Sequence, residues 1–183
     1  MPLSAGDLLQ NRYRIDRPLG QGGMGTVYLA ADQNLFDNLC AIKENAFTEL
    51  LAQEQFKLQA RLLSQLSHPN LPRVTDHFIE PDGRQYLVMD YVEGEDLEAR
   101  RQGIPQPEGQ VLAWLRDIFS AVDYLHGKGV VHRDIKPANI RLCPGGKAVL
   151  VDLGIAKVLS RQTLTGAHAT TSGFAPSPGA ARG

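Results

Sequence analysis

Short apolar stretches separated by turn residues fill roughly the first half of the chain, and this pattern is typical of strands in a small β-sheet. Strands are predicted at 13–19 and 26–31, on either side of the stretch GQGGMG, and at 38–44. Two more strands, at 74–80 and 85–92, flank the turn sequence PDG. Between these groups, apolar residues recur every three or four positions from about Ala46 to Leu66, which predicts one helix ending at the sequence HPN.

The second half begins with a long amphipathic pattern that predicts a helix at 107–129. Its apolar positions are Val111, Leu112, Trp114, Leu115, Ile118, Phe119, Val122 and Leu125. They cover an arc of roughly 160°, wider than the usual apolar stripe, so we expect this helix to be buried on more than one side. Strands at 139–142 and 148–153 follow, around the turn CPGGK. From about Ser160, small and polar residues with proline predict a flexible tail.

Composition narrows the class of protein without naming a function. The 183 residues are 43% hydrophobic and 21% charged, as in an ordinary globular domain, which could have two lobes. A net charge of −1 gives no general attraction to nucleic acid or to an anionic membrane. No apolar run approaches the ~18 residues of a membrane span, and the N-terminus lacks the apolar core of a signal sequence. We therefore expect a cytoplasmic protein with no membrane segment and no nucleic-acid partner.

The two cysteines, Cys40 and Cys143, lie in apolar, strand-like stretches and lack the spacing of a metal site or a disulfide framework. We expect both to be buried or half-buried thiols in a reducing compartment.

The stretch GQGGMGTV is the first candidate for chemistry, with Gly20, Gly22 and Gly25 followed by Val27. Glycines also mark ordinary tight hairpins, so this motif alone leaves the question open. A strand follows it, whereas the glycines of a dinucleotide-binding fold open a helix. A glycine hairpin between two strands can fold over phosphate groups, because no side chain blocks the backbone N–H groups.

Three later segments carry the remaining candidates. Lys43 lies in the third predicted strand, the segment HRDIKPAN contains Asp134, Lys136 and Asn139, and Asp152 ends an apolar strand before a glycine. Each has an ordinary explanation: a surface lysine, a loop-capping asparagine, a turn aspartate. The four motifs together, in this order, are a much more specific signal than any one of them alone.

In this order, the glycine-rich loop, the strand lysine, the sequence HRDIKPAN and the sequence DLG resemble the signature set of protein kinases. The stretches HPNLPRV, YLVMDYVEGEDL and HRDIKPANI look most like bacterial eukaryotic-like (Hanks-type) serine/threonine kinases. The resemblance runs from about residue 12 to residue 176. It implies an α+β, two-lobed fold, whose N-lobe is a five-stranded antiparallel sheet with one helix and whose helical C-lobe is incomplete.

The resemblance also implies an enzyme that transfers phosphoryl groups from ATP, with Mg²⁺, to serine or threonine hydroxyls of protein substrates. Asp134 would accept or orient the hydroxyl proton, and Lys136 would offset charge on the γ-phosphate. Asn139 and Asp152 would hold Mg²⁺. The implied ATP-binding residues are Leu19, Gly20, Gly22, Gly25, Val27, Ala41, Lys43, Met89, Asp90 and Val92. Because Arg133 precedes the catalytic aspartate, Thr163, Thr165 and Thr170 are candidate autophosphorylation sites, and Thr171 matches a threonine that contacts Asp134 and Lys136.

Three departures from the kinase pattern affect these expectations. Leu153 replaces the phenylalanine after the metal-binding aspartate, which is a mild change. Gln59 occupies the helix position at which kinases carry a glutamate paired with the strand lysine, and Glu54 lies about 140° away around the helix. Pro178 stands where the A-P-E motif has its glutamate, and the match ends there.

We therefore expect a C-terminally truncated kinase in which part of the 107–129 helix faces water. Such a chain would be marginally stable, aggregation-prone or dependent on a partner, and a shifted reading frame or early stop would explain the end of the match. The predicted organisation is an N-terminal extension at 1–12, an N-lobe at 13–89, a partial C-lobe at 90–159 and an activation-segment remnant at 160–183. Two alternatives to an active kinase stay open: a nucleotide-binding pseudokinase or scaffold, and a non-functional fragment.

Overall fold

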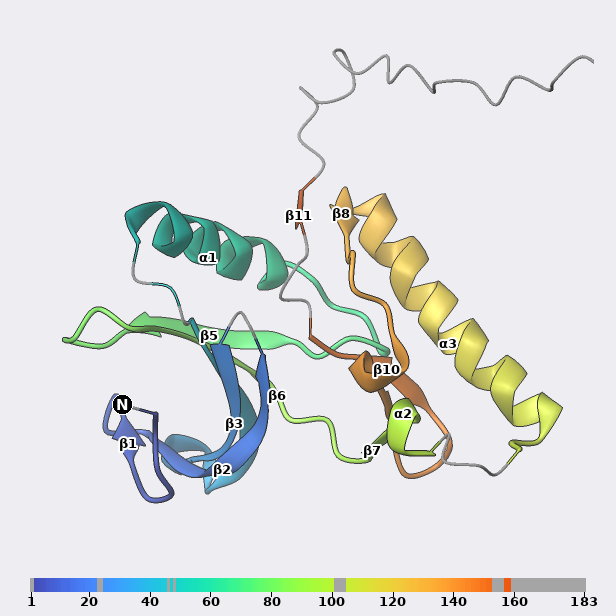
Figure 1. The fold of residues 1–183 in the computed structure, drawn as a ribbon, viewed down its shortest axis with the longest axis horizontal. Helices are drawn as coiled ribbons and strands as arrows, with labels where there is room; N and C mark the ends of the chain where they lie inside the picture. Colours follow the sequence, from blue (N-terminus) through green and yellow to red (C-terminus); the bar gives the residue numbers. More distant parts are fainter. Residues whose placement is uncertain are drawn as a thin grey trace, which may run out of the picture.

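The computed structural model describes residues 2–22, 25–45, 47, 49–100, 105–152 and 157–158, the last two by their backbone alone (Figure 1). The first half forms a curled antiparallel sheet with one helix. The second half is built around a long helix, which stands at the opposite edge of the molecule from the N-terminal strand.

The sheet of the first half has six strands in the order β1-β2-β3-β4-β6-β5, and its described pairings are antiparallel. The strands are β1 (Leu8–Leu9), β2 (Tyr13–Gly22), β3 (Gly25–Asp32), β4 (Asn38–Glu44), β5 (Val74–Ile79) and β6 (Gln85–Asp90). Five of them match predicted strands. The sixth, β1, lies within the predicted N-terminal extension and pairs with the start of β2.

Helix α1 (Leu50–Leu63) packs against the sheet and contacts β5 and β6. It buries Phe56, Ala60 and Leu63, which share one face at spacings of four and three. The predicted helix at 46–66 was too long at both ends. A short 3-10 helix, η1 (Gln33–Leu35), joins β3 to β4.

The second half contains helices α2 (Leu97–Arg100) and α3 (Glu108–Gly127), the 3-10 helix η2 (Pro137–Asn139), and short strands. These strands are β7 (Glu95–Asp96), β8 (Val130–Val131), β9 (Ile140–Leu142), β10 (Ala148–Leu150) and β11 (Lys157–Val158). β7, β9 and β10 form one small sheet, and β8 pairs with β11. The predicted α+β architecture, with an antiparallel sheet, one helix and a smaller helical part, is confirmed.

Gly94 lies in the segment that joins the two halves. Its φ is 138°, and an added Cβ would collide with the backbone of Leu142. Arg141 donates from Nη1 to the Gly94 carbonyl at 3.1 Å. Glycine is therefore required here, because the connecting segment runs against strand β9.

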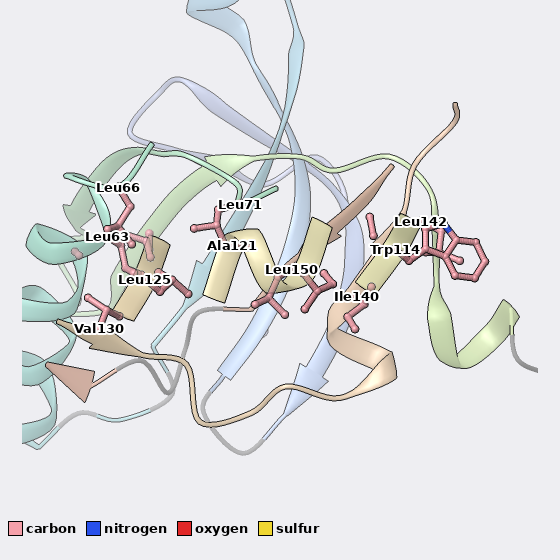
Figure 2. Close-up of a cluster of buried hydrophobic side chains, with 14 of the residues drawn as sticks. Leu63, Leu66, Leu71, Trp114, Ala121, Leu125, Val130, Ile140, Leu142 and Leu150 are labelled. Carbon is pink, nitrogen blue, oxygen red and sulfur yellow. The ribbon is translucent and has the colours of Figure 1, made fainter. Parts of the chain in front are cut away.

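One hydrophobic core joins the two halves. Leu63, Leu66 and Leu71 from the end of α1 and the following loop belong to the same buried cluster as Leu125 and Leu150 (Figure 2). A second cluster lies within the six-stranded sheet and includes the fully buried Tyr13, Tyr28 and Tyr86. The second half therefore completes the core on which α1 rests.

Polar contacts attach the loop after α1 to the second half. The buried side chain of Asn70 donates to the Ala148 carbonyl at 2.7 Å, and the Asn70 carbonyl accepts from the Leu150 N–H at 3.0 Å. The Ser67 N–H donates to the Tyr124 hydroxyl at 3.0 Å. These contacts fix residues 67–70 to β10 and α3.

Among the described residues, helix α3 is buried on one side only, so the expectation that it is buried on more than one side was wrong. Trp114, Ile118, Ala121 and Leu125 face the core, whereas Leu112, Leu115 and Phe119 are 45%, 45% and 66% exposed. The expectation that part of its wide apolar arc faces water is confirmed. Both cysteines are free thiols, Cys40 buried and Cys143 half-buried. None of the described helices is long and apolar enough to cross a membrane.

Candidate active site

A cleft of about 600 Å³ lies between the β2–β3 hairpin, strands β4 and β6, and the segment that carries Asp134. Fourteen residues singled out from the sequence line it: Leu19, Gly20, Gly22, Gly25, Val27, Ala41, Lys43, Met89, Asp90, Val92, Asp134, Lys136, Asn139 and Asp152. They come from segments far apart in the chain. The structure therefore brings into one cavity the residues that the motifs predicted to act together.

An ion pair spans this cleft. Lys43 lies on β4 opposite Val27 and Leu87, and its side chain is 9% exposed. Its Nζ is 2.6 Å from Oδ1 of Asp152, which follows β10 and has a φ of 59°. A buried lysine needs such a partner, because an unpaired charge loses its hydration without compensation. Strand β4 thus presents its cation directly to a carboxylate of the second half.

Asp134 is the centre of a second polar cluster. Its Oδ2 accepts from Nζ of Lys136 at 2.8 Å and from Nδ2 of Asn139 at 2.9 Å. The same amide nitrogen donates to the Asp134 backbone carbonyl at 2.8 Å. The hydrogen bond from Lys136 is the main cause that lowers the pKa of Asp134 below 3.8, so this carboxylate is ionised at neutral pH.

A buried histidine side chain and a backbone hydrogen bond hold this segment in place. His132 is 2% exposed, and its Nδ1 accepts from the Asp134 N–H at 3.3 Å. Burial lowers the pKa of His132 below 6.5, so the ring is neutral at physiological pH. The Asn139 carbonyl accepts from the Val151 N–H at 2.8 Å, one residue before Asp152. The Asp134 and Asp152 segments are therefore fixed to each other.

The opposite end of the cleft is apolar and open to the glycine-rich hairpin. Leu19, Val27 and Ala41 contribute aliphatic side chains to its lining. An added Cβ at Gly20 or Gly22 would meet no protein atom within 4 Å. Packing within the described protein therefore does not demand glycine at these positions. Both glycines line the cleft, where their backbone N–H groups could approach a ligand.

Gln59 lies outside this cleft, at a small cavity that Lys43, Leu63 and Asp152 also line. The helix position that the sequence register indicated therefore lies at a cavity beside the strand lysine. Glu54 lines a different pocket, between α1 and strand β5, which Lys43 does not line. This agrees with the angular argument that Glu54 cannot replace residue 59.

Other cleft-lining residues were not identified from the sequence. They are Gln21, Pro72, Asp96, Ala138, Arg141 and Val151. Several lie beside residues that were identified, so position next to a motif was the available signal. Pro72, in the loop after α1, and Asp96, in β7, reach the cleft only through contacts between distant parts of the chain. The predicted Leu153, Thr163, Thr165, Thr170 and Thr171 lie outside the described residues.

Comparison with known proteins identifies similar sequences over most of the chain. Residues 13–177 match the protein kinase domain family. The chain is 36% identical to the probable serine/threonine-protein kinase PknB of Lactococcus lactis over 89% of its length and 39% identical to serine/threonine-protein kinase B of Synechocystis over 92%. It is 33% identical to the probable serine/threonine-protein kinase YbdM of Bacillus subtilis over 89%. The matches span 26%, 33% and 64% of these relatives, so the chain corresponds to only part of each.

Proposed function

The chain belongs to the protein kinase family, and we propose on this basis that it transfers a phosphoryl group from Mg-ATP to serine or threonine hydroxyls of proteins. One observation carries the proposal: Lys43, Asp134, Asn139 and Asp152 line a single cleft beneath a glycine-rich hairpin. Phosphoryl transfer requires positioning and the neutralisation of phosphate charge more than it requires covalent help from the protein. This cleft offers cations, metal-binding oxygens and a carboxylate within one space.

The residues present fit a nucleotide and its magnesium ion. Mg²⁺ is commonly bound by one or two protein carboxylates together with substrate phosphates and water. Asp152 supplies a carboxylate, and both described hydrogen bonds of the Asn139 side chain use its nitrogen, which leaves the amide oxygen for a metal. Lys43 would hold the phosphates. Bound Mg-ATP would supply the phosphoryl group and neutralise its charge.

Asp134 would orient the attacking hydroxyl. Its Oδ2 is engaged by Lys136 and Asn139, whereas Oδ1 has no hydrogen-bond partner among the described residues. That oxygen would accept the hydrogen bond of a substrate hydroxyl. Because the pKa of Asp134 is lowered, the carboxylate positions the hydroxyl and receives its proton late, as the oxygen–phosphorus bond forms. Lys136 would accompany the transferred phosphoryl group.

Transfer of labelled phosphate from ATP to a generic basic protein tests this proposal directly. Wild-type protein should transfer label, and Asp134→Asn should abolish transfer. Asp134→Asn should still melt at a higher temperature with Mg-ATP, since a ligand that binds only the folded state stabilises it. Label transfer that persists in Asp134→Asn would contradict the assigned role.

A nucleotide-binding pseudokinase is the second candidate, and the neutral Gln59 beside Lys43 and Asp152 favours it. This protein would show the melting shift with Mg-ATP but no label transfer. A non-functional fragment would show neither, and would lack a cooperative melt. Protein substrates and autophosphorylation at Thr163, Thr165 or Thr170 also remain proposals, which mass spectrometry of the chain after incubation with Mg-ATP would test.

A further inference from the structure

Arg141 lines the active-site cleft, and the proposed function gives it no role. It lies in β9, two residues after Asn139, and its side chain is half-buried. Its Nη1 donates to the carbonyl of Gly94, which belongs to the segment that joins the two halves between β6 and β7 (Figure 1). Val92, in the same segment, also lines the cleft. The guanidinium is therefore held at the end of the cleft beside this connecting segment.

The neighbouring residues indicate which part of a ligand Arg141 meets. Leu19, Val27 and Ala41 line the cleft from the six-stranded sheet, whereas β9 belongs to the other half of the molecule. An anionic group placed against these aliphatic side chains would lose hydration without compensation. It would also meet the carboxylate of Asp96, which lines the cleft and pairs with Arg141 across β7 and β9. A flat, uncharged ring fits this end better than a second anion does.

The anchored guanidinium is well suited to stacking on such a ring. Its N–H groups lie in its own plane, so the hydrogen bond to Gly94 uses one edge and leaves the faces open. Arg141 forms no ion pair with another described residue, and no described aromatic ring lies against it. Guanidinium groups stack on aromatic faces because they are planar and weakly hydrated.

We propose that Arg141 binds the base of the nucleotide, with its guanidinium stacked on one face of the ring and the aliphatic side chains of the sheet on the other. The proposal rests on nucleotide binding in this cleft, which is part of the proposed function, but it does not depend on phosphoryl transfer. Stacking acts on the face of a base and not on its hydrogen-bonding edge. Arg141 therefore strengthens the binding of purine nucleotides without selecting adenine over guanine.

Isothermal titration calorimetry of the full chain with Mg-ATP, Mg-GTP and adenosine tests this proposal. Arg141→Met keeps an unbranched side chain but removes the guanidinium, and it should raise Kd for Mg-ATP by about fivefold. Kd for adenosine should rise by the same factor, because adenosine has the base but no phosphate. The ratio of the Kd values for Mg-ATP and Mg-GTP should stay that of the wild type.

Two further variants separate stacking from a general charge effect and from a structural role. Arg73→Met is the matched control, because Arg73 pairs with Asp90 but does not line the cleft; each Kd should stay within about twofold of the wild type. Arg141→Lys keeps the charge and a donor for the Gly94 carbonyl but has no planar face. If Arg141 stacks on the base, lysine should leave Kd for Mg-ATP raised by about threefold or more.

Three outcomes would overturn the proposal while nucleotide binding by the wild type stands. They are an unchanged Kd for Mg-ATP in Arg141→Met, a rise for Mg-ATP without one for adenosine, and full recovery of affinity in Arg141→Lys. A wild type that binds neither Mg-ATP nor adenosine would overturn the proposed function as well. Urea denaturation of each variant verifies folding.

Discussion

Gln59→Glu tests whether the neutral residue beside Lys43 limits nucleotide binding. In the structure Lys43 has a 2.6 Å ion pair with Asp152, and both residues would have to bind Mg-ATP. The ion pair therefore competes with the ligand. A carboxylate at position 59 would offer Lys43 a second anionic partner at the cavity that both side chains line, and would free Asp152 for the metal.

The expected size of the effect follows from the type of hydrogen bond. A neutral acceptor stabilises a bond by about 0.5–1.5 kcal/mol, and a bond to a charged group by about 1.5–3 kcal/mol. The gain is about 1–2 kcal/mol, before the cost of partly burying the new carboxylate. Since about 1.4 kcal/mol is tenfold in affinity, Kd for Mg-ATP should fall by about tenfold.

Isothermal titration calorimetry with Mg-ATP measures this change whether or not the chain turns over substrate. Gln55→Glu is the matched control, because Gln55 is exposed one turn earlier on α1 and does not line the cavity. Its Kd should equal that of the wild type. An unchanged or weaker Kd in Gln59→Glu would refute the reasoning, and would mean that Asp152 alone determines where Lys43 lies.

Further predictions concern stability and are measured by urea denaturation. Leu125→Ala should lower the free energy of unfolding by about 2–5 kcal/mol because Leu125 is fully buried, whereas the exposed Leu58→Ala should change it by less than about 0.5 kcal/mol; similar losses would contradict the core assignment. Trp114→Phe should lower the free energy of unfolding by about 0.5 kcal/mol, the low end for a hydrogen bond. The reason is that Gln110 also donates to the Gly146 carbonyl, which accepts from the Trp114 indole. A loss above about 2 kcal/mol would contradict this explanation. Burial lowers the pKa of three histidines below 6.5: His68, His77 and His132. The unfolded chain then binds more protons, so stability should be full above pH 6.5 and decline as the pH falls below it, and a flat profile between pH 7.5 and pH 5.5 would contradict this.

The sequence predicted the elements that local patterns specify. Strand β4 was predicted with its observed bounds, and α3 within two residues at either end, because apolar periodicity and flanking turn residues define them. The short strands β1, β7 and β8 were not predicted. Each has only two residues, and its pairing depends on a partner elsewhere in the chain, as when Glu95 and Asp96 meet Leu142 and Arg141.

The same distinction between local patterns and long-range contacts applies to the candidate site. Residues within motifs were identified because several chemical groups recur in a recognisable order. Asp96 and Arg141 line the cleft through the contact of β7 with β9, which no local pattern reveals. The Lys43–Asp152 ion pair joins residues 109 positions apart, so the motifs indicated a shared ligand but not that the two side chains would bind each other.

The contacts of residues 67–70 with the second half anchor α1 at its C-terminal end. Asn70 and Ser67 hold the C-terminal end to β10 and α3, while Leu50 at the other end is 82% exposed. The helix is about 21 Å long, and Gln59 lies only about 6 Å from its C-terminal end. In a tilt about that end, Leu50 would move about three times as far as Gln59, against the hydrogen bond that Gln53 donates to the Gly83 carbonyl at 3.3 Å. Large displacements at Leu50 can accompany small adjustments beside Lys43.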